Sequence, residues 1–296
     1  MNRIALRAHD GRTLAGYRFD PPATSTGSVV IAGAMATPQS FYAPFATYLA
    51  AAGYSVWTFD YRDSGESLQG GMRGAKSDIT DWVARDYDAV VTMAADAQPG
   101  GPLFVVGHSL GGQTAPLLVS RNRLAGLINI AVGSGSIRHN TPKIRRSAPL
   151  MWHLMVPLLC PLFGYFPGER IGVIGNIPTA AMKQWRRWCL TPDYLLSGEA
   201  GARAAYASAT FPVLALTFSD DELLLEAGSR MLHDAYTSRP PDYRVIEPAK
   251  VGLTRIGHFG FFKPPSAQVL WPLVTNWMAE IGAAHRIGTI APATSI

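Results

Sequence analysis

The segment Gly107-His108-Ser109-Leu110-Gly111 follows the pattern G-x-S-x-G, which sets one serine between two glycines. A serine hydroxyl becomes a strong nucleophile when a base takes its proton, and this pattern is typical of a sharp turn between a strand and a helix. The apolar run 103–106 predicts the strand, and the residues from Leu110 onward predict the helix. Glycines are needed because side chains would clash in so tight a turn. Pro116 predicts a kink in the helix.

A serine of this kind needs a histidine as base, and in this arrangement the histidine follows the acid in the chain. Of the seven histidines, His258 is the best placed. It lies in the turn Ile256-Gly257-His258-Phe259-Gly260, after the last predicted strand and before the final predicted helix. A purely structural histidine is the alternative interpretation.

Three acidic residues follow the predicted strand 212–218, in Ser219-Asp220-Asp221-Glu222. We predict that Asp221 orients His258, because the acid in such loops falls three residues beyond the strand. Asp220 is the alternative if the turn shifts by one residue; otherwise it braces the turn. Glu222 is expected to serve the first turn of the next helix.

Two backbone N–H groups must stabilise the negative oxygen that forms when the serine attacks a carbonyl carbon. We expect the first from Leu110 and the second from Ala34, in the turn after a strand ending at Gly33, with Met35 as the alternative. A tight loop is predicted at the carboxyl edge of the sheet, in the segment Asp60-Tyr61-Arg62-Asp63-Ser64-Gly65-Glu66-Ser67. Its ion pair is interpreted as structural.

Predicted strands and helices alternate along the chain, and this alternation would bring the candidate residues together. Continuous apolar runs, typical of strands buried on both faces, occur at 28–32, 54–59, 103–106, 127–132, 212–218 and 243–246. Helical patterns lie at 40–52, 78–97, 110–121, 223–236 and 266–281. The alternation predicts an α/β fold with a mostly parallel sheet and helices on both faces. Residues 3–7 and 13–19 flank Asp10-Gly11, so a hairpin is expected at one edge.

Residues 136–206 interrupt this rhythm and are predicted to form a helical cap inserted into a core of residues 1–135 and 207–283, with a flexible tail at 284–296. Nine basic and three acidic residues give the insertion a net charge of +6, which leaves −1 for the remainder of a chain whose total is +5. The basic pI of about 9.3 therefore comes from the insertion. A solvated face is the simpler interpretation, and a local cationic surface is the alternative. The apolar stretch 148–166 contains three prolines, which makes a membrane span improbable.

Composition narrows the class of protein. With 48% hydrophobic and 16% charged residues, the chain is neither disordered nor fibrous. Two cysteines and no leader-like start predict a reducing, cytoplasmic location. Neither a metal nor an organic cofactor is expected, since no cluster has ligand spacing, and no nucleic-acid partner is expected, because the charge is local.

These features together resemble the α/β-hydrolase superfamily over nearly all of residues 13–281. The segments 33–42, 184–188 and 257–262 are similar to a little-characterised bacterial group of predicted serine hydrolases related to the serine aminopeptidase and monoacylglycerol lipase-like branch. Two positions depart from the usual pattern: Asp63 replaces a glycine, and Ala32 replaces a histidine. The resemblance implies that the insertion is a lid shaping the substrate site. Contacts with substrate are then expected from five side chains: Met35, His108, Trp152, Trp185 and Phe259.

The sequence thus favours a serine hydrolase of carboxylic esters, acting on a small-molecule substrate with a hydrophobic acyl group. Amide or thioester cleavage and acyl transfer remain alternatives on the same residues, as does a ligand-binding protein without activity. A lipase that uses the basic insertion at a membrane surface is the weaker alternative.

Overall fold

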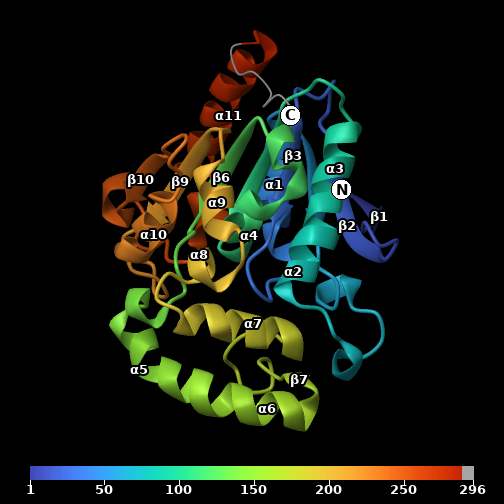
Figure 1. The fold of residues 1–296 in the computed structure, drawn as a ribbon. Helices are drawn as coiled ribbons and strands as arrows, with labels where there is room; N and C mark the ends of the chain where they lie inside the picture. The colour runs from blue at the N-terminus through green and yellow to red at the C-terminus, as the bar shows by residue number, and fades with distance from the viewer. Residues whose placement is uncertain (289–296) are drawn as a thin grey trace.

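The computed structural model describes residues 1–288. They include an eight-stranded sheet with helices packed on both faces (Figure 1). The strand order is β1-β2-β4-β3-β5-β6-β9-β10. All neighbouring pairs are parallel except β1 with β2 and β2 with β4. The strands are β1 (Asn2–Arg7), β2 (Thr13–Phe19), β3 (Ser28–Ala32), β4 (Ser55–Phe59), β5 (Leu103–His108), β6 (Gly126–Ile130), β9 (Val213–Phe218) and β10 (Asp242–Ile246). The predicted hairpin is β1 and β2, in the register Arg7↔Thr13.

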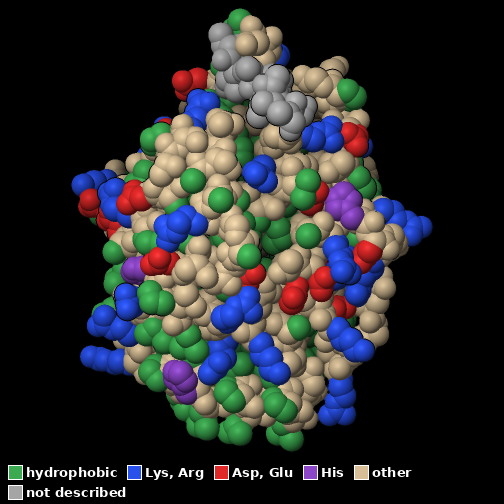
Figure 2. Space-filling model, in the orientation of Figure 1, with side chains coloured by type: hydrophobic (Ala, Val, Ile, Leu, Met, Phe, Trp, Pro, Cys, Tyr) green, Lys and Arg blue, Asp and Glu red, His purple; other side chains and the backbone are tan. Residues whose placement is uncertain are grey.

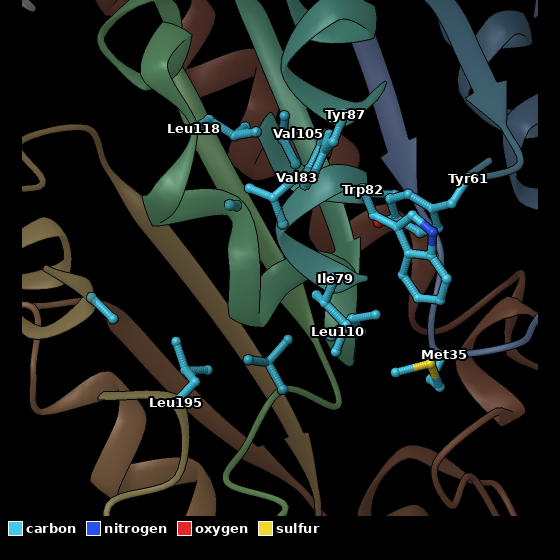
Figure 3. Close-up of a cluster of buried hydrophobic side chains, with 14 of the residues drawn as sticks. Met35, Tyr61, Ile79, Trp82, Val83, Tyr87, Val105, Leu110, Leu118 and Leu195 are labelled. Atoms are coloured by element: carbon cyan, nitrogen blue, oxygen red, sulfur yellow. The ribbon is translucent and has the colours of Figure 1, made fainter. Parts of the chain in front are cut away.

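Alternate residues of the central strands enter two separate cores. Val30 and Val105 pack on the side of α3 (Asp88–Asp96), whereas Val29 and Phe104 pack on the side of α1 (Ala43–Ala51) and α11 (Trp271–Arg286). Every residue of β3 and β5 is buried. This two-sided burial explains why the strands read as unbroken apolar runs. Figure 3 shows the first core, which extends from Leu118 and Val105 to Leu110 and Met35.

The helices differ from the sequence prediction mainly in length. Segment 78–97 is helical throughout, as α2 (Ile79–Asp81), a π-helical stretch (Trp82–Tyr87) and α3. The helix predicted at 110–121 ends early: α4 (Leu110–Thr114) gives way to a 3-10 turn at Ala115–Leu117 and a second at Val119–Arg123. Pro116 lies in the first of these turns, since it cannot donate an N–H to a regular helix. The helix predicted at 223–236 is α10 (Glu226–His233).

The insertion, residues 136–206, forms a layer against the carboxyl ends of the strands (Figure 1). It is helical as expected, but it also holds a short antiparallel pair, β7 (Tyr165–Phe166) and β8 (Ile177–Pro178), which the sequence prediction missed. Its helices are α5 (Pro142–Leu150), α6 (Val156–Phe163), α7 (Thr179–Leu190), α8 (Leu195–Gly198) and α9 (Ala202–Ala207). A π-helical stretch, Met151–Met155, joins α5 to α6.

The end of the chain was predicted to be a flexible tail from residue 284. The described part of this tail instead continues α11 as far as Arg286. The rest of the predicted tail, 289–296, lies outside the described residues. No helix within residues 1–288 combines the length and the apolar character needed to cross a bilayer.

Candidate active site

Ser109 stands at the turn between β5 and α4, with φ of 48° and ψ of −112°. This conformation is strained for any residue other than glycine and is held here by the packing around it. A Cβ on Gly107 would lie 2.3 Å from the Cα of Gly112, and a Cβ on Gly111 would lie 2.2 Å from the carbonyl oxygen of Ala32. Both flanking positions therefore require glycine, and the turn presents the serine at the carboxyl edge of the sheet.

Asp221 and His258 meet at the same edge, although 37 positions separate them in the chain. The Nδ1 of His258 is 2.8 Å from Oδ2 of Asp221, and both side chains are almost completely buried. The other carboxylate oxygen, Oδ1, accepts the backbone N–H groups of Leu223 and Leu224. The acid is thus fixed on both of its oxygens and can hold the imidazole in one orientation.

The neighbouring acids hold the turn that carries His258. Asp220 accepts the backbone N–H groups of Ile256 and Gly257, at 2.9 and 3.0 Å. Glu222 accepts the backbone N–H of His258 at 3.0 Å. Asp220 therefore braces the histidine turn and not, as expected, the turn that follows β9. The role expected for Glu222 was also wrong: its carboxylate serves the histidine turn, and α10 starts only at Glu226.

Ser109 and His258 line one cavity of about 230 Å³ between the sheet edge and the insertion. No hydrogen bond joins the Ser109 hydroxyl to His258 among the described residues. Contacts between such groups are often long before substrate binds. Met35, Trp152 and Trp185, three of the five side chains expected to contact substrate, also line this cavity. A larger hollow of about 690 Å³ lies between α2 of the core and α7 of the insertion, and none of the candidate residues lines it.

The N–H of Ala34, the second donor expected for the oxyanion, is not free for that role in the structure. The Ala34 N–H donates to the hydroxyl of Tyr42 at 2.8 Å, so it is already engaged. The N–H groups of Met35 and Leu110 donate to no described residue, and both residues line the cavity.

His108 lies beneath the site and not in the cavity, which corrects its expected contact with substrate. Its Nε2 is 2.9 Å from the carbonyl oxygen of His258, and its Nδ1 is 2.9 Å from the hydroxyl of Tyr42. A carbonyl only accepts, so Nε2 carries the proton. Burial, reinforced by the neighbouring His258, holds the pKa of His108 well below its ordinary value, so the ring is neutral and Nδ1 accepts from Tyr42.

These contacts form one chain of hydrogen bonds under the site, which we call the Tyr42–His108 link. It joins the turn after β3, the serine turn and the histidine turn. Sequence reasoning missed Tyr42, since no local pattern marks a hydroxyl that bonds eight residues back along the chain.

Phe259 also lies outside the cavity, so its expected contact with substrate is not supported. Its ring packs against Phe41 and His108 and borders a separate hollow on the surface. Residue 259 follows the histidine, and the turn sends the two side chains to different sides.

The loop 60–67 has the structural role that was expected. Asp60 accepts the N–H groups of Gln39 and Glu66, and Arg62 pairs with Asp86 and Asp10. Asp63 adopts φ of 58°, the left-handed region in which glycine is usual and aspartate is tolerated. Its carboxylate pairs with Arg12 at 2.5 Å. These contacts tie the loop to the turn after β3 that carries Met35.

Other reactive groups are scarce around the cavity. Cys189 also lines it, but burial raises the pKa of its thiol well above the ordinary value, which keeps it protonated and inert. Within residues 1–288, no three histidine, cysteine or carboxylate side chains gather as metal ligands would.

Comparisons with known proteins show which proteins this chain is similar to. A family model described as "Serine aminopeptidase, S33" matches residues 23–164, which include Ser109. A monoacylglycerol lipase of Mycolicibacterium smegmatis is 36% identical over 94 residues. That match covers 32% of each protein, so the chain matches about a third of its curated relative.

Solved structures show the fold over nearly the whole chain. A soluble variant of the monoglyceride lipase of Saccharomyces cerevisiae has a TM-score of 0.68 at 16% identity and covers 94% of both chains. The monoacylglycerol lipase of Paleococcus ferrophilus has a TM-score of 0.59 at 16% identity, covering 90% of this chain and 99% of that one. An esterase of Pyrococcus furiosus gives 0.61 at 14% identity, covering 95% and 91%. The sheet and its helices are therefore those of the α/β-hydrolase fold.

Proposed function

We propose that this chain, which has the α/β-hydrolase fold, is a serine hydrolase of carboxylic esters with Ser109 as its nucleophile. The observation that carries the proposal is the buried His258–Asp221 pair, which borders the same cavity as Ser109. Met35 and Leu110 border that cavity too, each with an N–H that has no other partner in the described chain. A nucleophile, a base, an acid and two oxyanion donors are the complete set that acyl transfer needs.

The reaction follows from these groups. The Ser109 oxygen attacks the ester carbonyl carbon while its proton passes to His258, and Asp221 stabilises the imidazolium that forms. The carbonyl oxygen becomes negative and accepts the N–H groups of Met35 and Leu110. The intermediate then collapses, its bond to the alcohol breaks, and His258 protonates the departing oxygen. Water, activated by the same histidine, attacks the acyl-enzyme and releases the acid.

The cavity favours an apolar group of moderate size. Its lining includes Ile144, Ala148, Met151, Leu223 and Leu224 as well as the two tryptophans. A volume of 230 Å³ holds about eight water-sized groups at about 30 Å³ each. We therefore expect acyl chains of roughly four to eight carbons to react best.

A series of 4-nitrophenyl esters of increasing chain length, hydrolysed by the wild type and by Ser109→Ala, tests this function. We expect kcat/KM to peak within the series and to fall to background in the variant. Cys189→Ala is the matched control, because Cys189 lines the cavity without being the nucleophile, and it should keep its activity. An active Ser109→Ala enzyme would refute the assignment.

Amide cleavage, thioester cleavage and acyl transfer to an alcohol would use the same groups. These reactions are distinguished by comparing, in one assay, the cleavage of anilides, the cleavage of thioesters and the products formed when an alcohol is added. A protein that only binds ligands is separated by the same series, since it would hydrolyse no ester at any chain length.

A second candidate function, hydrolysis at a lipid surface, is favoured by the outer face of the insertion. Residues 142–163 form one continuous helix with a buried face and an exposed face. Four side chains spaced four residues apart are buried, and four others, each two positions further along the chain, are exposed. The buried set is Ala148, Trp152, Val156 and Cys160; the exposed set, which we call the leucine stripe, is Leu150, Leu154, Leu158 and Leu162. The stripe residues are each at least 50% exposed. Two positions correspond to about half a turn, so the sets lie on opposite faces.

The surroundings of the leucine stripe complement an anionic surface. Several cations of the insertion form no ion pair within the described chain: Arg138, Lys143, Arg145, Arg146, Arg170 and Lys183. Figure 2 shows hydrophobic side chains gathered at the bottom of the molecule, with lysines and arginines beside them. The inner face of the same helix contributes Ala148, Met151 and Trp152 to the cavity. An anionic lipid surface bound here would lie next to the proposed site.

Cosedimentation with phosphatidylglycerol-containing vesicles tests this second function. Replacing Leu154 and Leu158 by serine should weaken binding by more than about tenfold, since each leucine loses roughly 1 kcal/mol of burial. Val119→Ser is the control, because Val119 is 78% exposed but lies on the core domain. Binding should also fall with salt. Equal binding of all three proteins would refute the proposal.

A further inference from the structure

We propose that Asn140 is a specificity-determining residue that hydrogen-bonds a hydroxyl or carbonyl group carried by an otherwise apolar substrate. This inference rests on the proposed function and names the substrate class of the same site. Asn140 lines the cavity beside Ser109 and His258 and is only 6% exposed. Its side-chain amide forms no hydrogen bond with any residue in the described chain.

Most other polar side chains of the cavity are already engaged in hydrogen bonds. The Tyr194 hydroxyl donates to Gln113 and accepts the indole N–H of Trp185, both at 3.1 Å. The Gln113 amide donates to the carbonyl of Gly133, and the Ser147 hydroxyl donates to that of Ile144. Apart from Ser109, His258 and the Cys189 thiol, two polar side chains of the described lining have no hydrogen-bond partner in the described chain: the amide of Asn140 and the indole N–H of Trp152. Of these two, only the Asn140 amide can both donate and accept.

The backbone around Asn140 is fixed to the loop that carries the acid. Asn140 and Leu224 form an antiparallel bridge. On either side of it, the Thr141 N–H donates to the carbonyl of Leu223 at 3.1 Å, and the Leu225 N–H donates to that of His139 at 2.8 Å. The Leu224 N–H is held by Asp221. Asn140 is thus held in register with Asp221, as a group that recognises substrate must be.

The amide atoms of Asn140 remain accessible from the cavity, where water can pair with them. A substrate that displaces this water must supply a partner or leave the amide unsatisfied, which is costly. An apolar ester leaves the amide unpaired, so the site should discriminate against it. Because an amide both donates and accepts, either a hydroxyl or a carbonyl is suitable. The substrate class is therefore an ester of moderate length bearing one such group, on its acyl or its alcohol part.

The test compares kcat/KM for matched ester pairs in the wild type and in Asn140→Leu, which keeps the size but removes the amide. One set pairs 4-nitrophenyl hexanoate with its 4-oxo, 5-oxo and 5-hydroxy derivatives; the other pairs butyl butanoate with hydroxybutyl butanoate. For each pair, the ratio of kcat/KM for the polar ester to that for the apolar ester is compared between the wild type and the variant. Differences in the intrinsic reactivity of the two esters cancel in this comparison. We expect this ratio to fall at least tenfold in Asn140→Leu for one or more pairs, as kcat/KM rises for the apolar ester and falls for its polar partner.

Two further variants sharpen the result. Asn140→Asp, which accepts but does not donate when ionised, should keep the preference for a hydroxyl and lose that for a carbonyl. Ser147→Ala is the control, because Ser147 lines the cavity but its hydroxyl is engaged by Ile144. Its ratios should match the wild type, and thermal unfolding should show every variant folded.

The outcomes separate this inference from the proposed function. If the apolar esters are hydrolysed but every ratio is unchanged in Asn140→Leu, the role of Asn140 is refuted and the hydrolase stands. If no ester of either set is hydrolysed by the wild type, the proposed function itself fails.

Discussion

Replacing Tyr42 by phenylalanine breaks the Tyr42–His108 link at its centre while leaving the ring in place. The hydroxyl accepts the Ala34 N–H at 2.8 Å and donates to His108 Nδ1 at 2.9 Å, and Tyr42 is only 1% exposed. Burial raises the pKa of this hydroxyl above its ordinary value, so it remains a donor throughout the working pH range. Its removal leaves one buried donor and one buried acceptor without partners.

Each unsatisfied group costs about 1–3 kcal/mol, so we expect Tyr42→Phe to lower the free energy of unfolding by about 2–4 kcal/mol after some relaxation. Activity should also fall, because Ala34 immediately precedes the proposed oxyanion donor Met35. Loss of one such donor costs about a hundredfold or more in kcat, and a displaced donor should cost about tenfold. KM should change little, since Tyr42 does not line the cavity.

Urea unfolding and steady-state kinetics on one ester check both expectations. Tyr48→Phe is the matched control: its hydroxyl forms a single 3.3 Å hydrogen bond to Thr275, far from the proposed site. We expect that control to lose less than about 1 kcal/mol and no activity. If Tyr42→Phe behaved like Tyr48→Phe in stability and kcat, the Tyr42–His108 link would not position the site.

Three other changes follow from the structure. Asp221→Asn should lower kcat by about 10⁴-fold, because the imidazole of His258 loses its orientation. Asp220→Asn loosens only the histidine turn and should lower kcat about tenfold. Steady-state kinetics on one ester compares the two variants. Gly107→Ala should yield little folded protein in expression and circular dichroism, because its Cβ would overlap Gly112. Burial lowers the pKa of His233 to about 4, so its contribution to stability is complete above pH 6.5 and is lost as the pH falls below that value. Between pH 7 and 5.5 that loss is about 1 kcal/mol, and His233→Asn should remove this part of the pH dependence in urea unfolding.

The sheet could be predicted from the sequence because its strands are short, apolar and buried on both faces. The serine turn and the histidine turn were predictable for a related reason: each is marked by glycines at fixed positions next to a strand. Asp221 was predicted as the acid because it lies three residues beyond the end of β9. In the structure it is Asp221, not Asp220, that lies beside the imidazole of His258.

The errors arose where a distant side chain decides the local structure. Ala34 was chosen as the oxyanion donor because nothing in the turn itself reveals that the Tyr42 hydroxyl occupies its N–H. His108 and Phe259 flank the reactive residues in sequence, yet neither ring lines the cavity. His108 forms hydrogen bonds beneath the site, and Phe259 packs against Phe41 and His108 beside a separate surface hollow. Asn140 lay in a segment without a pattern, and its place in the cavity depends on the bridge to Leu224.

The most direct test of the account is the site of covalent labelling by a fluorophosphonate. Peptide mapping should find the phosphonyl group on Ser109 in the wild type and nowhere in Ser109→Ala, with labelling slowed at least a hundredfold in His258→Ala. A fully folded wild type that takes up no label, or an adduct on another residue, would contradict the claim that Ser109 is the nucleophile.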